Sequence, residues 1–344
     1  MKEAQEKMFL GTENLAVGYD KHADPLHRNI NVSVKAGQFI CLLGPNGAGK
    51  STLIKTLSGF LKPLDGQVWY GKDKIENLSE AHRAKRVSVV LTDRIDVQNL
   101  SVFELVALGR TPYTGFFGKL MKQDVELVLH AIEEVGLKGY AQKHMDKMSD
   151  GERQKAMIAK ALVQETPFII LDEPTAFLDL PAKIEIMQLL RRLSRKKNRG
   201  ILLSTHDLEM ALQIADKIWL LGQGRTLQEG IPEDLVLSND FKCFFEREGI
   251  EFDNITGSFL YHNIKREPIS IVGTGIRSTW VSRALYRIGF EPVIDDCEWK
   301  VEVGSGAPHI YSLYFRGKLL GESNSIEHLL NSISAQLITD LNNL

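Results

Sequence analysis

Short apolar runs separated by turn residues occupy the first seventy positions of the chain. They predict strands over four segments, Phe9–Val17, Ile30–Val34, Phe39–Leu43 and Gly66–Tyr70. Gly37 and the Pro-Leu-Asp-Gly group at 63–66 supply the turn residues between them. The amino-terminal part is therefore expected to be rich in β-structure.

Further along the chain, strand-like runs alternate with segments of helical periodicity. The expected strands are Arg86–Leu91, Phe168–Leu171, Ile201–Ser204 and Ile218–Leu221. The expected helices are Thr52–Phe60, Arg153–Val163, Ala182–Leu193 and Leu208–Ala215. This alternation is typical of a largely parallel sheet covered by helices. A block at about 100–148 has helical periodicity alone and opens with a capping box at Ser101–Glu104, which predicts a helical subdomain.

After Pro232 the alternation fades, and the pattern changes again near residue 268. The stretch 246–267 mixes charges and glycines without a period, which indicates a linker between a domain over 1–245 and another over 268–344. The last segment predicts a small α+β domain: strands at Ile269–Val272, Pro292–Ile294, Lys300–Val303 and Ile310–Phe315, and helices at Thr279–Ile288 and Ile326–Leu341. A length of 344 residues agrees with two domains.

Charge and cysteine content narrow the classes of function. The 42 basic and 44 acidic residues give no basic excess, so nucleic acid is not an expected partner. Cys41, Cys243 and Cys297 lie far apart without a C-x-x-C pair, which favours a reducing compartment over a disulfide framework or a zinc site. No run approaches the roughly 18 apolar residues of a membrane span, and the charged amino terminus does not resemble a signal peptide. A soluble protein is expected, whose membrane role would come from a partner.

The segment Gly44–Ser51 matches the phosphate-binding pattern G-x-x-x-x-G-K-[ST]. It follows an apolar strand and precedes a helix, so its backbone amides and the helix amino terminus are expected to hold phosphate oxygens. Lys50 would reach the β- and γ-phosphates, and the Ser51 hydroxyl would ligate Mg²⁺. The expected ATP-binding residues here are Gly44, Pro45, Asn46, Gly47, Ala48, Gly49, Lys50, Ser51 and Thr52. The alternative is a glycine-rich turn with an incidental Lys-Ser.

Two adjacent carboxylates end the apolar run Phe168–Leu171. Asp172 is expected to hold Mg²⁺ through water, and Glu173 to polarise the attacking water. If the strand continued, the two side chains would point to opposite sides. A solvated acidic turn is the alternative interpretation. His206 follows the next apolar strand and is a candidate for contact with the γ-phosphate, although a histidine there can equally be an ordinary surface or core residue.

The segment Ser149–Glu152, read Ser-Asp-Gly-Glu, precedes a predicted helix that leads into the Asp172 strand. Together with the phosphate loop it resembles ABC ATPases, whose signature Leu-Ser-Gly-Gly-Gln stands at this place; Met148–Glu152 is a variant of it with three substitutions. Ser149 and Glu152 also form a capping box, so a simple helix start explains both. The signature residues implied are Ser149, Asp150, Gly151 and Glu152. The resemblance covers roughly residues 8–240 and implies a P-loop ATPase fold: a RecA-like core with an antiparallel β subdomain and a helical subdomain.

The resemblance also implies how the site is assembled. A second copy of the chain would donate the signature helix, so that two subunits enclose two ATP molecules. Tyr19 would stack on adenine, although tyrosines before loops more often serve packing, and Asp179 would lie in the loop that links the two sites. Where the family has a glutamine near the metal, this chain has Thr92-Asp93. Thr92, or alternatively Asp93, is therefore a further candidate metal ligand, and the rate and coupling of hydrolysis are in question.

The segment Glu104–Tyr113 looks like one in the ATPases of importers for iron-siderophore complexes, haem and cobalamin. This implies a cytoplasmic subunit, peripheral on the inner face of the membrane, that works with permease subunits and, through them, a substrate-binding protein. Two alternatives stay open: a non-transport ABC ATPase, and a regulatory nucleotide-binding module that has lost catalysis. In the carboxy-terminal domain, Gly273-Thr274-Gly275 lacks a third glycine, so it predicts a tight turn more than a phosphate site. We expect an accessory domain that is regulatory or stabilises the dimer, with a specific small ligand as the alternative.

Overall fold

The computed structural model describes residues 8–20, 24–91, 99–115, 118–245, 250–253, 257–261, 267–304 and 310–342. The chain forms two compact units, Met1–Leu260 and Tyr261–Leu344.

A six-stranded sheet forms the centre of the first unit, in the order β11-β10-β4-β9-β8-β7. Its strands are β4 (Phe39–Leu43), β7 (Val87–Val90), β8 (Phe168–Leu171), β9 (Gly200–Ser204), β10 (Lys217–Leu220) and β11 (Gln228–Gly230). All neighbours pair in parallel except β11, an antiparallel edge strand. Every residue of β4, β8 and β9 is buried, as the continuous apolar runs predict for strands covered on both faces. The predicted parallel sheet is confirmed.

A second, antiparallel sheet lies at the amino-terminal end of this unit. It consists of β1 (Met8–Val17), β2 (His27–Ile30), β3 (Ser33–Lys35), β5 (Asp65–Tyr70) and β6 (Asp73–Lys74). The single strand predicted over Ile30–Val34 was wrong. The chain makes two short strands there, interrupted at Asn31 and Val32, where side chains replace backbone partners: Asn31 Oδ1 accepts from the Asn14 amide at 2.8 Å, and the Val32 amide donates to Thr12 Oγ1 at 2.9 Å. Both strands pair with β1.

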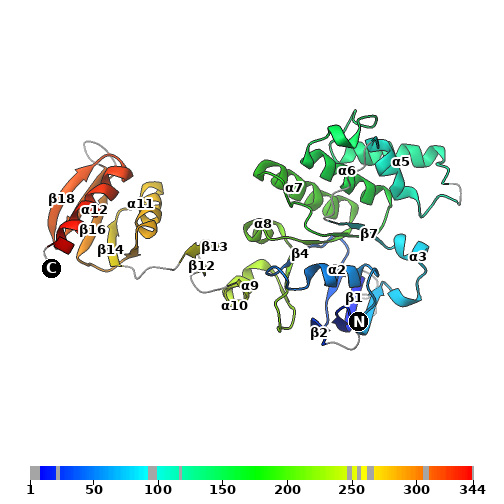
Figure 1. The fold of residues 1–344 in the computed structure, drawn as a ribbon, viewed down its shortest axis with the longest axis horizontal. Helices are drawn as coiled ribbons and strands as arrows, with labels where there is room; N and C mark the ends of the chain where they lie inside the picture. The colour runs from blue at the N-terminus through cyan, green and yellow to red at the C-terminus, as the bar shows by residue number, and fades with distance from the viewer. Residues whose placement is uncertain are drawn as a thin grey trace. The chain divides into compact units, whose positions relative to one another are not determined.

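Helices cover the central sheet and build a separate layer in Figure 1. The helical block contains α4 (Val102–Ala107), η2 (Leu108–Arg110), α5 (Lys122–Glu134), η3 (Met145–Lys147) and α6 (Asp150–Val163). The remaining helices of the unit are α2 (Lys50–Leu57), η1 (Ile75–Asn77), α3 (Glu80–Ala84), α7 (Leu180–Lys197), α8 (Leu208–Ile214), α9 (Pro232–Leu237) and α10 (Asp240–Phe245). The capping box at Ser101–Glu104 is confirmed. No helix in the described ranges is long and apolar enough to cross a lipid bilayer.

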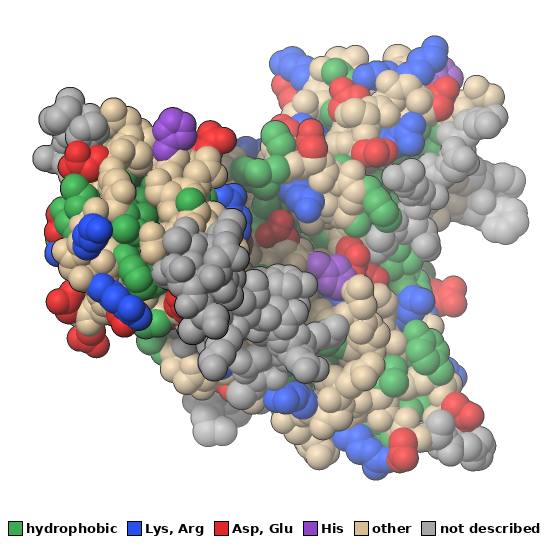
Figure 2. All heavy atoms as spheres, turned by 60° about the vertical axis from the view of Figure 1, so that its left-hand side comes forward, with side chains coloured by type: hydrophobic (Ala, Val, Ile, Leu, Met, Phe, Trp, Pro, Cys, Tyr) green, Lys and Arg blue, Asp and Glu red, His purple; other side chains and the backbone are tan. Residues whose placement is uncertain are grey.

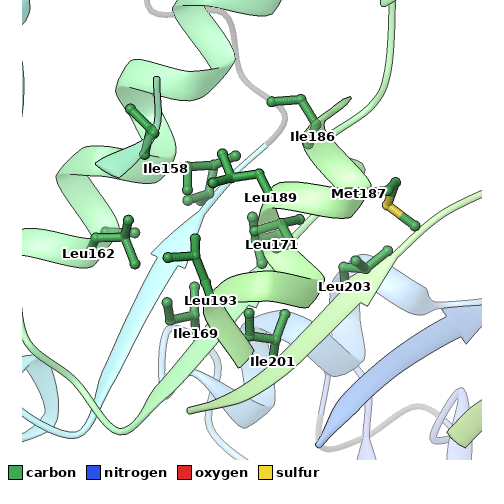
Figure 3. Packing of buried hydrophobic residues seen from close by; sticks show 14 of the residues in the cluster. Ile158, Leu162, Ile169, Leu171, Ile186, Met187, Leu189, Leu193, Ile201 and Leu203 are labelled. Carbon is green, nitrogen blue, oxygen red and sulfur yellow. The ribbon is translucent and has the colours of Figure 1, made fainter. Parts of the chain in front are cut away.

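Helices α6 and α7 pack their apolar faces on strands β8 and β9. Figure 3 shows Ile158 and Leu162 of α6 and Leu193 of α7 close to the side chains of these strands. This packing matters for the site, because α6 begins at the signature segment and β8 ends at Asp172. One continuous core therefore supports both predicted parts of the site.

The stretch interpreted as an irregular linker, 246–267, contains regular structure. Strands β12 (Ile250–Asp253) and β13 (Ser258–Tyr261) form a two-stranded sheet. Phe252 is 3 % exposed and joins the main core of the first unit, so part of this stretch belongs to that unit. The aromatic side chains of Phe252 and Phe259 pack and support these strands. The charged residues around them hid this strand pattern in the sequence.

The second unit has a five-stranded sheet in the order β15-β14-β16-β17-β18. Its strands and helices are β14 (Glu267–Val272), α11 (Ile276–Arg287), β15 (Phe290–Val293), β16 (Trp299–Val303), β17 (Tyr311–Phe315), β18 (Lys318–Ser323) and α12 (Ile326–Asn342). Its own core includes Ile269, Trp299 and Leu313. The α+β class is confirmed; the edge strand β18 was not predicted.

Candidate active site

The phosphate loop connects β4 to α2, as its sequence predicts. At Gly44 the backbone passes so close to the next strand that a Cβ would lie 2.1 Å from the carbonyl oxygen of Leu221. Gly49 has a φ of 91° and caps the amino terminus of α2. Both positions therefore require glycine. The loop presents its amides at the start of a helix, which is the arrangement that binds anions.

Two residues that sequence analysis did not single out support this loop. The His27 ring is 4 % exposed, and its Nε2 lies 2.6 Å from the carbonyl oxygen of Ala48. Because a carbonyl can only accept, Nε2 carries a proton and donates to it. The Gln223 side chain donates from Nε2 to the carbonyl oxygen of Gly47 at 3.2 Å. Neither contact has a local sequence signal, since 21 and 176 residues separate the partners.

Lys50 is 6 % exposed and lies over the loop. Its Nζ donates to the carbonyl oxygens of Gly44 at 2.8 Å and Pro45 at 3.1 Å. Burial lowers the pKa of Lys50, and the negative charges of Glu173 and Asp172 oppose that shift. A phosphate oxygen arriving here would replace neutral carbonyl partners with a charged one, so the buried ammonium favours anion binding.

The two carboxylates leave the sheet immediately after β8. The strand ends at Leu171, and Glu173 has a positive φ of 48°, so the expected alternation along a continuing strand does not hold. One hydroxyl ties the pair together: Ser204 Oγ donates to Asp172 Oδ1 at 2.6 Å and accepts from the Glu173 amide at 2.9 Å. Ser204 is fully buried on β9. Parallel strands ending at one edge thus bring these groups together.

His206 and Glu173 form a direct contact. His206 Nε2 lies 2.6 Å from Glu173 Oε1, and both side chains are partly exposed. They line a cavity of about 350 Å³ together with Thr175, Thr205 and Asp207. Asp207 is the N-cap of α8 and accepts from the Met210 amide at 3.2 Å, which fixes the turn that carries His206. The structure therefore brings together the two residues predicted to be catalytic.

Tyr19 lies beside the start of α2. Its hydroxyl accepts a hydrogen bond from Thr52 Oγ1 at 3.0 Å, and 67 % of its surface is exposed. An exposed aromatic ring next to the phosphate loop has the geometry needed to receive a base by stacking. Stacking on adenine stays a prediction.

The signature segment forms the start of α6. The Glu152 amide donates to Ser149 Oγ at 3.3 Å, and the Ser149 amide donates to Glu152 Oε2 at 3.0 Å, so the predicted capping box is confirmed. Lys143 also donates to Glu152 Oε2 at 3.1 Å, and Ser149 and Asp150 are exposed. A Cβ at Gly151 would lie 3.3 Å from Ala182 Cβ, so this turn packs closely against α7. An exposed helix amino terminus is available to a second molecule.

Asp179 is the N-cap of α7, where its side chain accepts from the Ala182 amide at 3.0 Å. Beside it, Phe177 has a positive φ of 64° and is 73 % exposed.

The candidate metal ligand Thr92, with Asp93, lies outside the described residues. On the face drawn in Figure 2, acidic and basic side chains are interspersed.

Comparison with known proteins decides the family. The family model described as ABC transporter matches residues 27–176. An uncharacterised ABC transporter ATP-binding protein of Methanocaldococcus jannaschii is 39 % identical over 288 residues, which are 83 % of this chain and 99 % of that protein. The chain belongs to the ABC transporter ATP-binding family. The ABC resemblance of the sequence is thereby confirmed, and ATP is the nucleotide of this ABC ATPase.

Two further relatives of this ABC protein are named for specific transport systems. The petrobactin import ATP-binding protein of Bacillus anthracis is 36 % identical, over 67 % of this chain and 84 % of that protein. The ferric enterobactin transport ATP-binding protein of Escherichia coli is 35 % identical, over 65 % of this chain and 82 % of that protein. The model described as iron ABC transporter C-terminal domain matches residues 265–334, in the second unit.

Solved structures agree with the ABC fold. A chain from an inward-facing ABC transporter assigned to the metal-chelate type has a TM-score of 0.61 and 26 % identity, and the match covers 74 % of this chain and 96 % of that one. A dimeric bacterial ABC transporter cassette has a TM-score of 0.57 and 25 % identity, over 65 % of this chain and 98 % of that one. The predicted fold class is confirmed.

Proposed function

We propose that this ABC protein hydrolyses ATP as a dimer and thereby drives a membrane permease that imports a metal chelate. The observation that carries the proposal is the convergence of Lys50, Asp172, Glu173 and His206 at the carboxyl edge of one parallel sheet. Fold alone would not assign an activity. A buried cation bound to a phosphate loop, next to a paired carboxylate and imidazole, provides the groups that phosphoryl transfer to water needs.

The phosphate loop binds and orients the triphosphate. Its amides and the start of α2 attract the phosphate oxygens, while Lys50 exchanges its bonds to Gly44 and Pro45 for bonds to the β- and γ-phosphates. Tyr19 offers its exposed ring to the adenine. His27 and Gln223 hold the loop in shape, so little reorganisation is needed when the nucleotide arrives.

The oxygen groups near the phosphates fit Mg²⁺. The donor set consists of a hydroxyl and a buried carboxylate, and the Ser204 hydroxyl orients that carboxylate through Asp172 Oδ1. Ser51 and Asp172 would hold the ion, the latter through water, and the ion would neutralise charge on the phosphate oxygens.

Glu173 acts on the attacking water, and His206 acts on the γ-phosphate. The Glu173 carboxylate orients the water and accepts its proton as the oxygen attacks the γ-phosphorus, and the bond from phosphorus to the bridging oxygen of ADP breaks. His206 is held at 2.6 Å from Glu173 and would contact the γ-phosphate. Because the pair lines an open cavity, water has access to it.

A second copy of the chain completes each site. The proposal places Ser149, Asp150, Gly151 and Glu152 of one subunit against the ATP held by the other, and Asp179 in the loop between the two sites. Two observations support it: the start of α6 is exposed, and a cassette of similar fold is dimeric. The amides at that helix start would bind the γ-phosphate as an anion.

The cargo is proposed from the relatives. Their names specify petrobactin, ferric enterobactin and, at 30 % identity, cobalamin import. The carboxy-terminal domain matches a family described as the C-terminal domain of iron ABC transporters. We therefore propose an iron chelate, with haem or cobalamin as the alternatives, delivered by a substrate-binding protein to permease subunits. The ABC protein would sit on the cytoplasmic face of the membrane, attached through those subunits.

The test of the activity is ATP turnover by the purified full-length chain with Mg²⁺. Turnover is expected, and Glu173→Gln should abolish it while ATP binding persists. Equal residual turnover in both proteins would contradict the assignment of Glu173. Binding without any turnover in the parent chain would favour a regulatory nucleotide-binding module. Copurification from the native source, with identification of the membrane subunit and its cargo, tests the transport role.

A further inference from the structure

The cavity that holds Glu173 and His206 is lined in part by a residue from far along the chain. Phe259 lies on β13, in the two-stranded sheet between α10 and the second unit, and its side chain is among those that line the cavity. The other lining residues come from the segments that follow β8 and β9, and from α7 and α8. Nothing in the roles proposed above accounts for an apolar ring at this place.

Phe259 is fixed by aromatic packing. Its ring meets those of Phe245 at 6.0 Å and Phe252 at 5.4 Å, both edge to face. Phe241 in turn stacks on Phe245 at 6.0 Å and on Phe252 at 5.6 Å. Phe241 and Phe252 are buried in the main core of the first unit, so the cluster anchors β12 and β13 to α10. Aromatic pairs of this geometry stabilise beyond simple burial, which gives the ring a defined position.

The turn before β13 also lies close to the helix that follows His206. Gly257 has a φ of 66°, and a Cβ there would lie 3.6 Å from Leu212 Cδ1 on α8. Helix α8 begins directly after Asp207, the residue that caps the turn carrying His206. The segment that leads into the second unit thus lies along α8: Phe259 lines the cavity beside the start of this helix, and Gly257 lies near Leu212 toward its end.

We propose that Phe259 is a positioning residue for the Glu173–His206 pair. Its ring, which is 41 % exposed, forms an apolar wall of the cavity that the pair lines. This wall limits the water beside the carboxylate and imidazole, which strengthens their interaction and keeps Glu173 aimed at the attacking water. Tyr261, two positions later, begins the second unit. The strand that completes the catalytic cavity is therefore the strand that connects to the carboxy-terminal domain. Displacement of that connection would alter the chemical step. The inference rests on the proposed hydrolysis of ATP.

The test compares Phe259→Ala, Phe259→Leu and the control Leu237→Ala in the full-length chain. Leu237 is an apolar residue on α9 that is 78 % exposed and lines no part of this cavity. Steady-state ATP turnover is measured at a temperature well below each variant's unfolding midpoint. Phe259→Ala should lower kcat by about threefold or more and leave KM within about twofold, because it acts on the chemical step and not on nucleotide binding. Phe259→Leu, which keeps apolar bulk, should restore most of kcat, and Leu237→Ala should match the parent.

The outcomes separate this inference from the function on which it rests. Turnover in the parent that Glu173→Gln abolishes establishes hydrolysis independently of Phe259. If the parent turns over ATP and Phe259→Ala has the same kcat, the inference is overturned and the proposed function stands. A rise in KM with unchanged kcat, or a kcat for Phe259→Leu as low as that of Phe259→Ala, would also contradict it.

Discussion

Replacing Ser204 with alanine should damage both stability and catalysis, because one hydroxyl serves two groups. Ser204 is fully buried and donates to Asp172 Oδ1 at 2.6 Å while it accepts from the Glu173 amide at 2.9 Å. Hydrogen bonds to a charged group contribute about 1.5–3 kcal/mol, and a buried amide left without a partner costs about 1–3 kcal/mol. Since the methyl side chain of alanine fits the space, the two losses together should lower the free energy of unfolding by about 2.5–6 kcal/mol.

The catalytic effect of Ser204→Ala follows from geometry. Without the hydroxyl, nothing fixes the Asp172 carboxylate relative to the backbone of Glu173 in the way that Ser204 does. A misplacement of about 1 Å can lower the rate by a factor of about 100. We expect kcat to fall by about tenfold to a hundredfold. Urea denaturation and steady-state ATP turnover measure the two effects on the same preparation.

Ser58→Ala is the matched control. Ser58 is also a buried serine, 5 % exposed, and its Oγ donates to the Ile54 carbonyl oxygen at the end of α2. That oxygen already accepts a hydrogen bond from the Ser58 amide, so it keeps a partner when the hydroxyl is removed. It should lose about 1 kcal/mol or less and keep its kcat. Equal stability losses for the two variants, or an unchanged kcat for Ser204→Ala, would refute the argument that this hydroxyl organises the carboxylates.

Three further predictions use other parts of the structure. Glu173→Gln should bind ATP and accumulate as a dimer that light scattering detects; a monomer at saturating ATP would count against the enclosed site. Lys50→Met should raise the unfolding temperature of the nucleotide-free protein, because burial lowers the pKa of Lys50 and so disfavours its charged form. The same variant should bind ATP more weakly. A lower unfolding temperature than that of the parent would contradict the argument. Arg110→Ala should lower the free energy of unfolding, measured in urea, by about 3–5 kcal/mol, because it leaves the buried Asp124 carboxylate without the guanidinium at 2.9 Å. The control is Arg28→Ala, which removes one side of the exposed Arg28–Asp24 pair and should change that free energy by at most about 0.5 kcal/mol. The Met121 amide and, after it, Arg110 lower the pKa of Asp124 below its usual 3.8, so this stabilisation should be complete at neutral pH and lost only as the pH falls through the lowered pKa.

Much of the central fold could be predicted because its signals are local. The apolar runs Phe39–Leu43 and Phe168–Leu171 became β4 and β8 with unchanged bounds, since strands covered on both faces need an unbroken apolar stretch. The capping boxes at Ser101 and Ser149 are likewise complete within four residues. Local chemistry specified these elements.

The parts that escaped prediction depend on distant contacts. His27 supports the phosphate loop across 21 residues, and Ser204 holds Asp172 across 32. The sheet of β12 and β13 forms because Phe252 and Phe259 find Phe241 and Phe245, not because the segment has a strong period. A lone histidine, serine or phenylalanine has no spacing that would reveal such a partner, so only the folded chain identifies them.

The most direct test of the shared site uses mixed dimers of two variants, Lys50→Ala and Ser149→Arg. When one subunit carries each lesion, both fall in the same pocket and the other pocket is intact. When one subunit carries both lesions and its partner carries neither, each pocket is damaged. The dimers of each arrangement are isolated by affinity tags, and the labelled nucleotide that they trap is measured. Dimers with one lesion on each subunit should retain nucleotide, and dimers with both lesions on one subunit should lose it. Equal retention in the two arrangements would contradict a pocket built from the phosphate loop of one subunit and the signature helix of the other.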